Sequence, residues 1–134
     1  PRSLLLVGFS ASFAAKLADT FGSEIGKRWG RRPVLITTLR SVPPGTEGAI
    51  SLAGTLASAA GSVLMTLVMW QLQLLPSISV SLVVMLIGLL ATLAESLLGA
   101  LAQDRFRWLS NELVNALQTL LAALMAMLWL GGRI

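Results

Sequence analysis

Four long apolar stretches alternate with short polar segments along this chain. The apolar stretches cover residues 3–29, 51–75, 78–102 and 112–130. A helix rises 1.5 Å per residue, so about 20 residues cross the roughly 30 Å hydrocarbon core of a bilayer. The pattern therefore predicts an all-α, polytopic transmembrane helix bundle of about four spans. We expect these spans to form a single membrane domain over residues 1–134.

Small residues recur at helical spacing on the first predicted span. They lie four residues apart and are Ser10, Ala14, Ala18, Gly22 and Gly26. The first half of the second span is also rich in small residues, namely Gly54, Ala57, Ser58, Gly61 and Ser62. Small side chains allow two helix backbones to approach closely in a bilayer. These stripes therefore predict close helix–helix contacts.

Residues 30–50 are predicted to form a loop between the first two spans. Gly30 ends the first helix and Pro33 prevents its continuation. The β-branched run Val34–Thr38 is expected to be extended, and Pro43-Pro44-Gly45 is expected to form a turn. Pro76 and Ser77 predict a very short turn between the second and third spans.

Basic residues give the predicted orientation of the bundle. Five of the ten lie in or beside the first loop: Lys27, Arg28, Arg31, Arg32 and Arg40. Arg105 and Arg107 lie two crossings later, in the loop before the fourth span. Because positive residues collect on the cytoplasmic side of membranes, both loops are predicted to be cytoplasmic or stromal.

Composition supports a membrane protein and excludes several kinds of site. The chain is 55% hydrophobic and 12% charged, with a mean hydropathy of +0.81, whereas soluble domains carry about 25% charged residues. The net charge is +4, but the basic residues cluster between spans without aromatic partners, so no nucleic acid is expected as a partner. Cysteine and histidine are absent, which excludes disulfides, a cysteine nucleophile, a histidine base and a Cys/His zinc site. A bound metal would have oxygen ligands, which favours magnesium or calcium.

All six acidic residues are predicted to lie on the same side of the membrane. They are Asp19, Glu24, Glu47, Glu95, Asp104 and Glu112. A position at the interface explains Glu47 and Asp104, but Glu95 is predicted to lie about 10 Å inside the third span. An ionised carboxylate at such a depth is costly unless it is paired or bound to metal, so Glu95 is a functional candidate. Asp19 is a second candidate, with Lys16 as the alternative, purely structural partner.

Carboxylates beside basic residues suit the binding of a polyphosphate, because carboxylates hold Mg²⁺ and Mg²⁺ with cations neutralises phosphates. Hydroxyls and amides that are candidate phosphate donors belong to Thr37, Thr38, Gly45, Thr46, Gly48, Ser51 and Thr55. Two other interpretations are rejected. The stretch Gly22–Arg28 is one residue short of a P-loop and ends in arginine instead of serine or threonine. A nucleophilic serine would have no histidine base.

Several motifs in this chain resemble those of the transmembrane protein 19 and phytyl-phosphate kinase family of integral-membrane proteins. They are Asp19–Gly26 (DTFGSEIG), Ile36–Arg40 (ITTLR), Val42–Gly48 (VPPGTEG), Glu95–Ala100 (ESLLGA) and Asn111–Asn115 (NELVN). Glu95 and Glu112 stand where the family usually has aspartate. The resemblance extends more distantly to the dolichol and phytol kinase group. Since the family has further spans upstream, the chain is expected to be the C-terminal part of a longer architecture.

The resemblance implies a reaction in tocopherol biosynthesis. A phosphoryl group would pass from CTP, or another nucleoside triphosphate, to phytyl or prenyl monophosphate, with Mg²⁺ as the cofactor and the diphosphate as the product. The membrane would be the plasma or thylakoid membrane of a cyanobacterium, or a chloroplast membrane. The apolar groove between spans would hold the isoprenoid tail.

The resemblance also implies roles for individual residues. The catalytic residues would be Asp19, Glu24, Glu95 and Glu112, and the metal ligands Asp19, Glu95 and Glu112. The phosphate-binding residues would be Lys27, Arg28, Arg40, Gly45, Thr46, Gly48, Ser51 and Thr55. Residues that orient the site would be Ser23, Ser96, Asn111 and Asn115.

Three alternative functions fit parts of the sequence. A CTP-dependent lipid nucleotidyltransferase would need nearly the same residues. A non-catalytic small membrane subunit of a larger complex would use the acids as partners for the loop arginines. A transporter or channel fits less well, because the acids are predicted on one side only and a conduction path usually needs polar groups at the midplane or on both sides.

Overall fold

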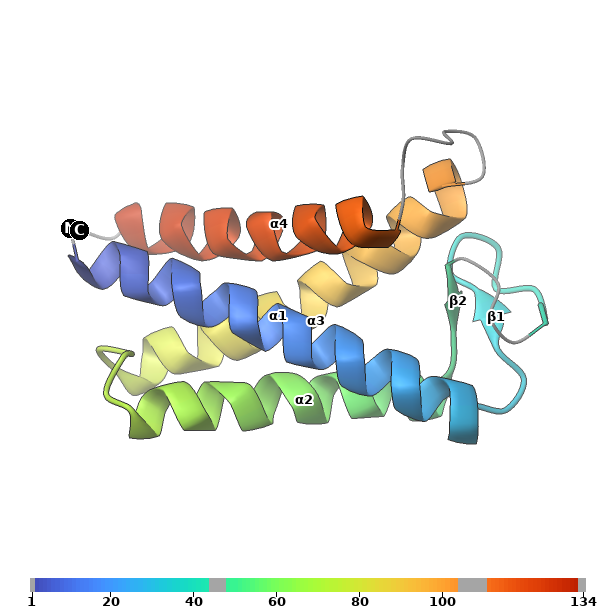
Figure 1. Cartoon of the computed structure of the whole chain (residues 1–134), viewed down its shortest axis with the longest axis horizontal. Helices are drawn as coiled ribbons and strands as arrows, with labels where there is room; N and C mark the ends of the chain where they lie inside the picture. Colours follow the sequence, from blue (N-terminus) through green and yellow to red (C-terminus); the bar gives the residue numbers. More distant parts are fainter. Residues whose placement is uncertain (1, 44–47, 104–110, 133–134) are drawn as a thin grey trace.

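The computed structural model describes residues 2–43, 48–103 and 111–132, and four long helices make up most of them (Figure 1). The helices are α1 (Arg2–Trp29), α2 (Leu52–Gln71), α3 (Ile78–Leu98) and α4 (Asn111–Gly131). All four are long and apolar enough to cross a membrane. The predicted all-α bundle of four candidate spans is therefore confirmed.

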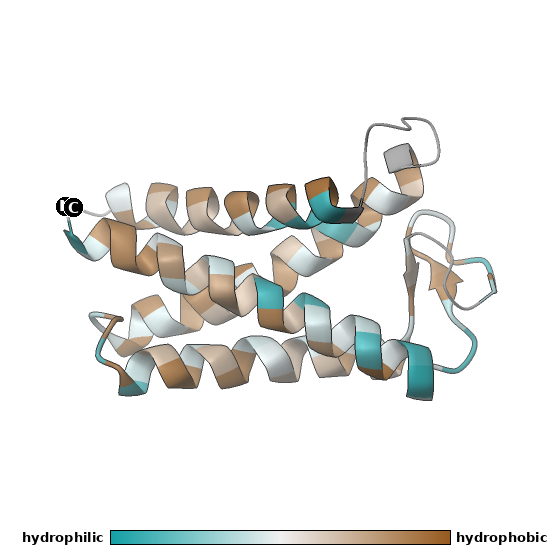
Figure 2. Cartoon of the chain, viewed as in Figure 1, coloured by the Kyte–Doolittle hydropathy of each residue, from teal (hydrophilic) through white to brown (hydrophobic). Residues whose placement is uncertain are grey.

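Successive helices run in opposite directions, so α1 and α3 end where α2 and α4 begin (Figure 1). We call this the polar end of the bundle, and it contains Trp29, Leu52, Leu98 and Asn111 at the helix termini. Figure 2 shows strongly polar residues on the last turns of α1 and the first turns of α4, while the middle of the bundle is mostly apolar. The fold therefore brings polar residues from distant parts of the sequence to one end.

The stripes of small residues form the contact between α1 and α2, which is the most extensive helix pair in the bundle. A methyl group added at Gly54 would lie 3.2 Å from Gly22 O and 3.4 Å from Gly26 Cα, and one at Gly61 would lie 2.7 Å from Leu17 O. The two backbones are thus in direct contact, as the stripes predict. Buried small residues of this contact and its surroundings are Ser10, Ala14, Ala18, Gly54, Ala57, Ser58, Gly61 and Ser62.

Gly61→Ala is expected to destabilise the bundle by about 1–3 kcal/mol, the usual cost of overpacking. Its new methyl group would press on the carbonyl of Leu17, which belongs to the helix backbone and has little freedom to move. Thermal unfolding in detergent measures the loss. Gly131→Ala is the matched control, since its nearest neighbour would be the flexible end of Leu4 at 4.0 Å. Equal unfolding temperatures for the two variants would contradict the tight α1–α2 contact.

The second predicted span is shorter than the apolar pattern indicates. Ser51 is the N-cap of α2 and accepts a hydrogen bond from Gly54 N at 3.1 Å, but the helix ends at Gln71, not at residue 75. The turn before α3 therefore has six residues, and the prediction of a very short turn at residues 76–77 was wrong. Leu75 lies beyond the end of the helix and packs back into the core, where it is 5% exposed. The apolar pattern therefore continues past Gln71 although the helix does not.

The loop between α1 and α2 contains a small antiparallel sheet of β1 (Val34–Leu35) and β2 (Ala49–Ile50). The extended run predicted for residues 34–38 was wrong beyond Leu35. Leu39 N donates to Leu35 O at 2.7 Å, which closes a turn instead of continuing the strand. The turn predicted at Pro43-Pro44-Gly45 falls mainly on residues 44–47, outside the described residues.

Gly48 fixes this sheet against the end of α3. Its φ of +81° lies in the left-handed region, and an added methyl group would overlap Ala100. Ala100 belongs to a π-helical turn, η1 (Gly99–Gln103), that follows α3 directly. The predicted third span thus continues past Leu98 with altered hydrogen bonding. The sheet is therefore held at the polar end, beside the third helix.

Candidate functional site

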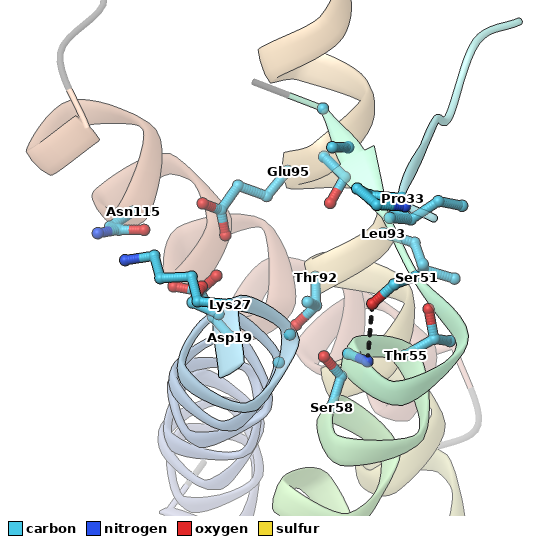
Figure 3. Close-up of a pocket in the computed structure, with 18 residues that line it drawn as sticks. Asp19, Lys27, Pro33, Ser51, Thr55, Ser58, Thr92, Leu93, Glu95 and Asn115 are labelled. Carbon is cyan, nitrogen blue, oxygen red and sulfur yellow. Dashed lines mark hydrogen bonds between the residues drawn. The ribbon is translucent and has the colours of Figure 1, made fainter. Parts of the chain in front are cut away.

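A cavity of about 530 Å³ lies at the polar end, between the four helices and the small sheet (Figure 3). The residues that line it are Asp19, Gly22, Ser23, Gly26, Lys27, Pro33, Gly48, Ala49, Ile50, Ser51, Gly54, Thr55, Ser58, Thr92, Leu93, Glu95, Ser96 and Asn115. Every helix of the bundle contributes, and so does β2. The cavity therefore depends on the whole fold and not on one local motif.

Two acids from different helices meet on one side of the cavity. The orientation of the Asn115 amide follows from its neighbours. With its nitrogen facing the acids, Asn115 donates to Glu95 Oε1 at 3.1 Å and to Asp19 Oδ2 at 3.2 Å. All three residues are half-buried, and Glu95 Oε2 is inaccessible to solvent. A single amide on α4 thus links carboxylates of α1 and α3. We call Asp19, Glu95 and Asn115 together the carboxylate wall.

A second polar layer lies one helical turn deeper, on the same three helices. Gln118 Nε2 of α4 donates to Ala15 O of α1 at 3.0 Å and to Thr92 Oγ1 of α3 at 3.1 Å. Gln118 is only 3% exposed. This layer was not predicted from the sequence, although the spacing indicates it: Gln118 follows Asn115 by three residues and Thr92 precedes Glu95 by three. That spacing places each pair on one helix face.

Hydroxyl groups at the start of α2 line another side of the cavity, which we call the hydroxyl wall. It consists of Ser51, Thr55 and Ser58. Ser51 Oγ accepts the bond from Gly54 N, drawn as a dashed line in Figure 3, so its hydroxyl hydrogen is still available to a ligand. Ser58 is 4% exposed and was not predicted as a site residue. It was recognised from the sequence only as a small residue.

Apolar side chains complete the lining next to the hydroxyl wall. They are Pro33, Ala49, Ile50 and Leu93. Pro33 and Leu93 lie across the view from Asp19 and Asn115 in Figure 3. We call these four residues the apolar wall.

The structure divides the residues predicted from the sequence into three groups. Those that line the cavity are Asp19, Ser23, Lys27, Gly48, Ser51, Thr55, Glu95, Ser96 and Asn115. Those that are exposed and do not line it are Glu24, Arg28, Arg40 and Glu112. Gly45, Thr46 and the side chain of Asn111 lie outside the described residues.

The carboxylate wall has the donor groups of a magnesium site with few protein ligands. Mg²⁺ is commonly held by one or two protein carboxylates, with phosphate oxygens and water as its other ligands. Asp19 and Glu95 supply such a pair. Within the described ranges, no three acidic side chains gather at one point, and Glu112 is exposed. The geometry therefore fits a two-carboxylate site that a phosphate ligand would complete.

Comparison with known proteins identifies the family. The model of the family described as integral membrane protein DUF92 matches residues 1–123. The chain belongs to the DUF92 family. The matched residues include every residue that lines the cavity. The family resemblance read from the sequence motifs is confirmed.

Three relatives are similar to this chain in sequence over most of its length. It is 43% identical to the membrane protein sll0875 of Synechocystis over 91% of its length, and 42% identical to protein VTE6, chloroplastic, of Arabidopsis thaliana over 93%. It is 39% identical to the membrane protein MJ0933 of Methanocaldococcus jannaschii over 92%. The chain spans 47%, 38% and 50% of these three proteins respectively. No solved structure matches it.

Proposed function

We propose that this DUF92 chain forms the phosphoryl-transfer site of a membrane-bound isoprenoid-phosphate kinase. The reaction would move the terminal phosphoryl group of CTP, or another nucleoside triphosphate, to phytyl or prenyl monophosphate. The observation that carries the proposal is the pair of carboxylates, Asp19 and Glu95, bridged by Asn115 in a cavity that also presents hydroxyls and apolar side chains. This set of groups suits two phosphorylated ligands, one of them a lipid.

The carboxylate wall would hold Mg²⁺ together with the triphosphate. The ion, when bound, neutralises charge on the phosphates and orients them. Asp19 and Glu95 would be its protein ligands, and Asn115 would fix both. Lys27 lines the same cavity and would add positive charge beside the phosphates.

The hydroxyl wall would bind the monophosphate acceptor. Ser51 and Thr55 have hydroxyl hydrogens for its oxygens. An acceptor phosphate oxygen attacks the terminal phosphorus of the nucleotide, and the bond from that phosphorus to the nucleoside diphosphate breaks. The acceptor oxygen is already anionic near neutral pH, so positioning and charge neutralisation suffice without a strong base.

The apolar wall would receive the isoprenoid tail. Ile50 and Leu93 line the cavity on its apolar side, close to the start of α2. A phosphate on Ser51 and Thr55 therefore leaves its tail beside these residues. Burying a hydrocarbon chain there is favourable by about 0.8 kcal/mol for each methylene group.

The comparisons support this assignment at the level of the family. VTE6 of Arabidopsis is chloroplastic by name, and the match to VTE6 covers 93% of the present chain. The motifs resemble those of phytyl-phosphate kinases. A chloroplast or cyanobacterial membrane is accordingly the proposed location, with the basic residues at the polar end directed to the cytoplasm or stroma.

Position-specific labelling of the nucleotide tests the proposal. The purified chain, and full-length sll0875 in parallel, are incubated in detergent with phytyl monophosphate, Mg²⁺ and CTP labelled at either the γ or the α phosphate. We expect γ label in the lipid diphosphate and no α label. Transfer of the α label would indicate the nucleotidyltransferase instead. Absence of both labels from both proteins would favour the non-catalytic subunit.

A further inference from the structure

Gln118 makes the polar contacts that connect three helices below the carboxylate wall. Its amide nitrogen donates to a backbone carbonyl of α1, at Ala15, and to a hydroxyl of α3, at Thr92. Thr92 Oγ1 in turn donates to Gly88 O at 3.0 Å in its own helix, and Ala15 O of α1 is its second acceptor, at 3.5 Å. Both amide hydrogens of Gln118 are therefore used, and the orientation of its side chain is fixed.

The two contacts lie one turn from the two proposed metal ligands. In an α-helix the carbonyl of residue i accepts the amide of residue i+4, so the carbonyl of Ala15 is the helical acceptor for the amide of Asp19. Thr92 lies three residues before Glu95 on the same face of α3. Gln118 thus holds each helix at the turn directly below a carboxylate, while Asn115 holds the carboxylates themselves.

Packing alone does not explain a glutamine at this position. Its Oε1 is buried and accepts no hydrogen bond from the described residues. A leucine or methionine of similar size would fill the space without that unsatisfied acceptor, and burial of an unsatisfied polar group is unfavourable. The benefit of the glutamine must therefore come from its two directed bonds.

We propose that Gln118 is a positioning residue that sets the spacing of Asp19 and Glu95 by fixing α1 to α3. Its relevance to catalysis rests on the proposed kinase function, but the spacing itself does not. The isosteric change Gln118→Met removes both bonds and retains the volume. We expect α1 and α3 to shift relative to each other by about 1–2 Å, as packed helices do when their contacts change.

The distance between the two helices is the first measurement. The chain has no cysteine, so cysteines introduced at Thr20 and Leu97, both exposed, carry spin labels without competing sites. Pulsed electron paramagnetic resonance then compares Gln118→Met with the unsubstituted labelled chain. The matched control is Thr119→Val, because Thr119 is the next residue of α4 and its hydroxyl donates to Ala116 O of the same helix. The control should keep the original distance.

Metal affinity is the second measurement. Mn²⁺ accepts the same oxygen ligands as Mg²⁺ and is visible by the same resonance method. Loss of a group that orients metal ligands typically weakens binding by about 10- to 100-fold, and we expect Gln118→Met to lie in that range. Thr92→Val removes the bond that Gln118 Nε2 donates to Thr92 Oγ1, and also the 3.5 Å contact of that hydroxyl with Ala15 O, while it changes the shape little. It should act in the same direction. The effects of the two substitutions should be less than additive in the double variant, since each of them removes the bond between Gln118 and Thr92.

The outcomes separate this proposal from the kinase proposal. An altered distance with weaker Mn²⁺ binding supports the positioning role, even if the unsubstituted chain transfers no label from CTP. A lower unfolding temperature with an unchanged distance in both Gln118→Met and Thr92→Val would mean that Gln118 serves stability alone, and would overturn the proposal. If Gln118→Met does not fold, Thr92→Val tests the layer that Gln118 and Thr92 form with Ala15 O, and an unchanged distance in that variant overturns the proposal.

Discussion

Asp19→Asn and Glu95→Gln are each expected to reduce phosphoryl transfer on the order of 100-fold or more. Each change keeps the size of the side chain but removes a negative charge from the carboxylate wall, where Asn115 links the two acids. Removal of one preorganised electrostatic group from an active site typically has an effect of this size. The measurement is the initial rate of transfer of γ label from CTP to phytyl monophosphate at several Mg²⁺ concentrations. Extra Mg²⁺ should restore part of the rate if the loss is in metal binding.

The same experiment on Glu24→Gln and Glu112→Gln tests whether the cavity is the site. All four acids were predicted to be catalytic, but Glu24 and Glu112 are exposed and do not line the cavity. Their substitution should leave the rate close to that of the unsubstituted chain. Rates as low as that of Asp19→Asn would contradict the assignment of the cavity and support the broader set.

The helical part of this fold is well predicted from sequence because the bilayer imposes a simple rule. Each span must satisfy its own backbone hydrogen bonds and must be apolar over about 20 residues. The small-residue stripe of α1 adds a packing face, and Gly22 and Gly26 do contact Gly54 as that stripe predicts. Hydropathy alone does not determine at which residue of an apolar run the helix ends. Leu75 shows this, since it is apolar yet packs into the core from a turn.

The site is only partly predictable, for a different physical reason. Individual candidates such as Asp19 and Glu95 are recognisable because charges inside a span are costly. Their pairing through Asn115, however, depends on the rotation of three helices about their axes, which no single stretch of sequence specifies. Neutral residues such as Gln118 and Thr92 are harder to find, because an amide or hydroxyl in a span is compatible with many structural roles. The tight sheet was missed because its two strands have only two residues each.

Gly48→Ala is expected to lower phosphoryl transfer by about 10- to 100-fold while the helical bundle remains folded. Gly48 adopts a φ of +81°, and an added methyl group would meet the backbone nitrogen and Cα of Ala100, each at 2.7 Å. An L-residue at such a φ is strained, and the backbone of η1 cannot move aside as a flexible side chain would. The sheet would therefore move away from α3, and Ile50 and Ser51 would move with it. Displacement of a binding group by about 1 Å is enough for a loss near 100-fold.

The control for Gly48→Ala lies in the same loop. Ser41→Ala changes an exposed residue that pairs with Val34 through its backbone, so both the sheet and the rate should be retained. Helix content by circular dichroism should be equal for both variants, because α1 to α4 do not depend on the sheet for their own hydrogen bonds. Under these conditions a selective loss of rate in Gly48→Ala makes the sheet a wall of the site. A rate equal to that of Ser41→Ala would show that phosphate binding and transfer need only the four helices, and would remove Gly48 and the apolar residues of β2 from the site.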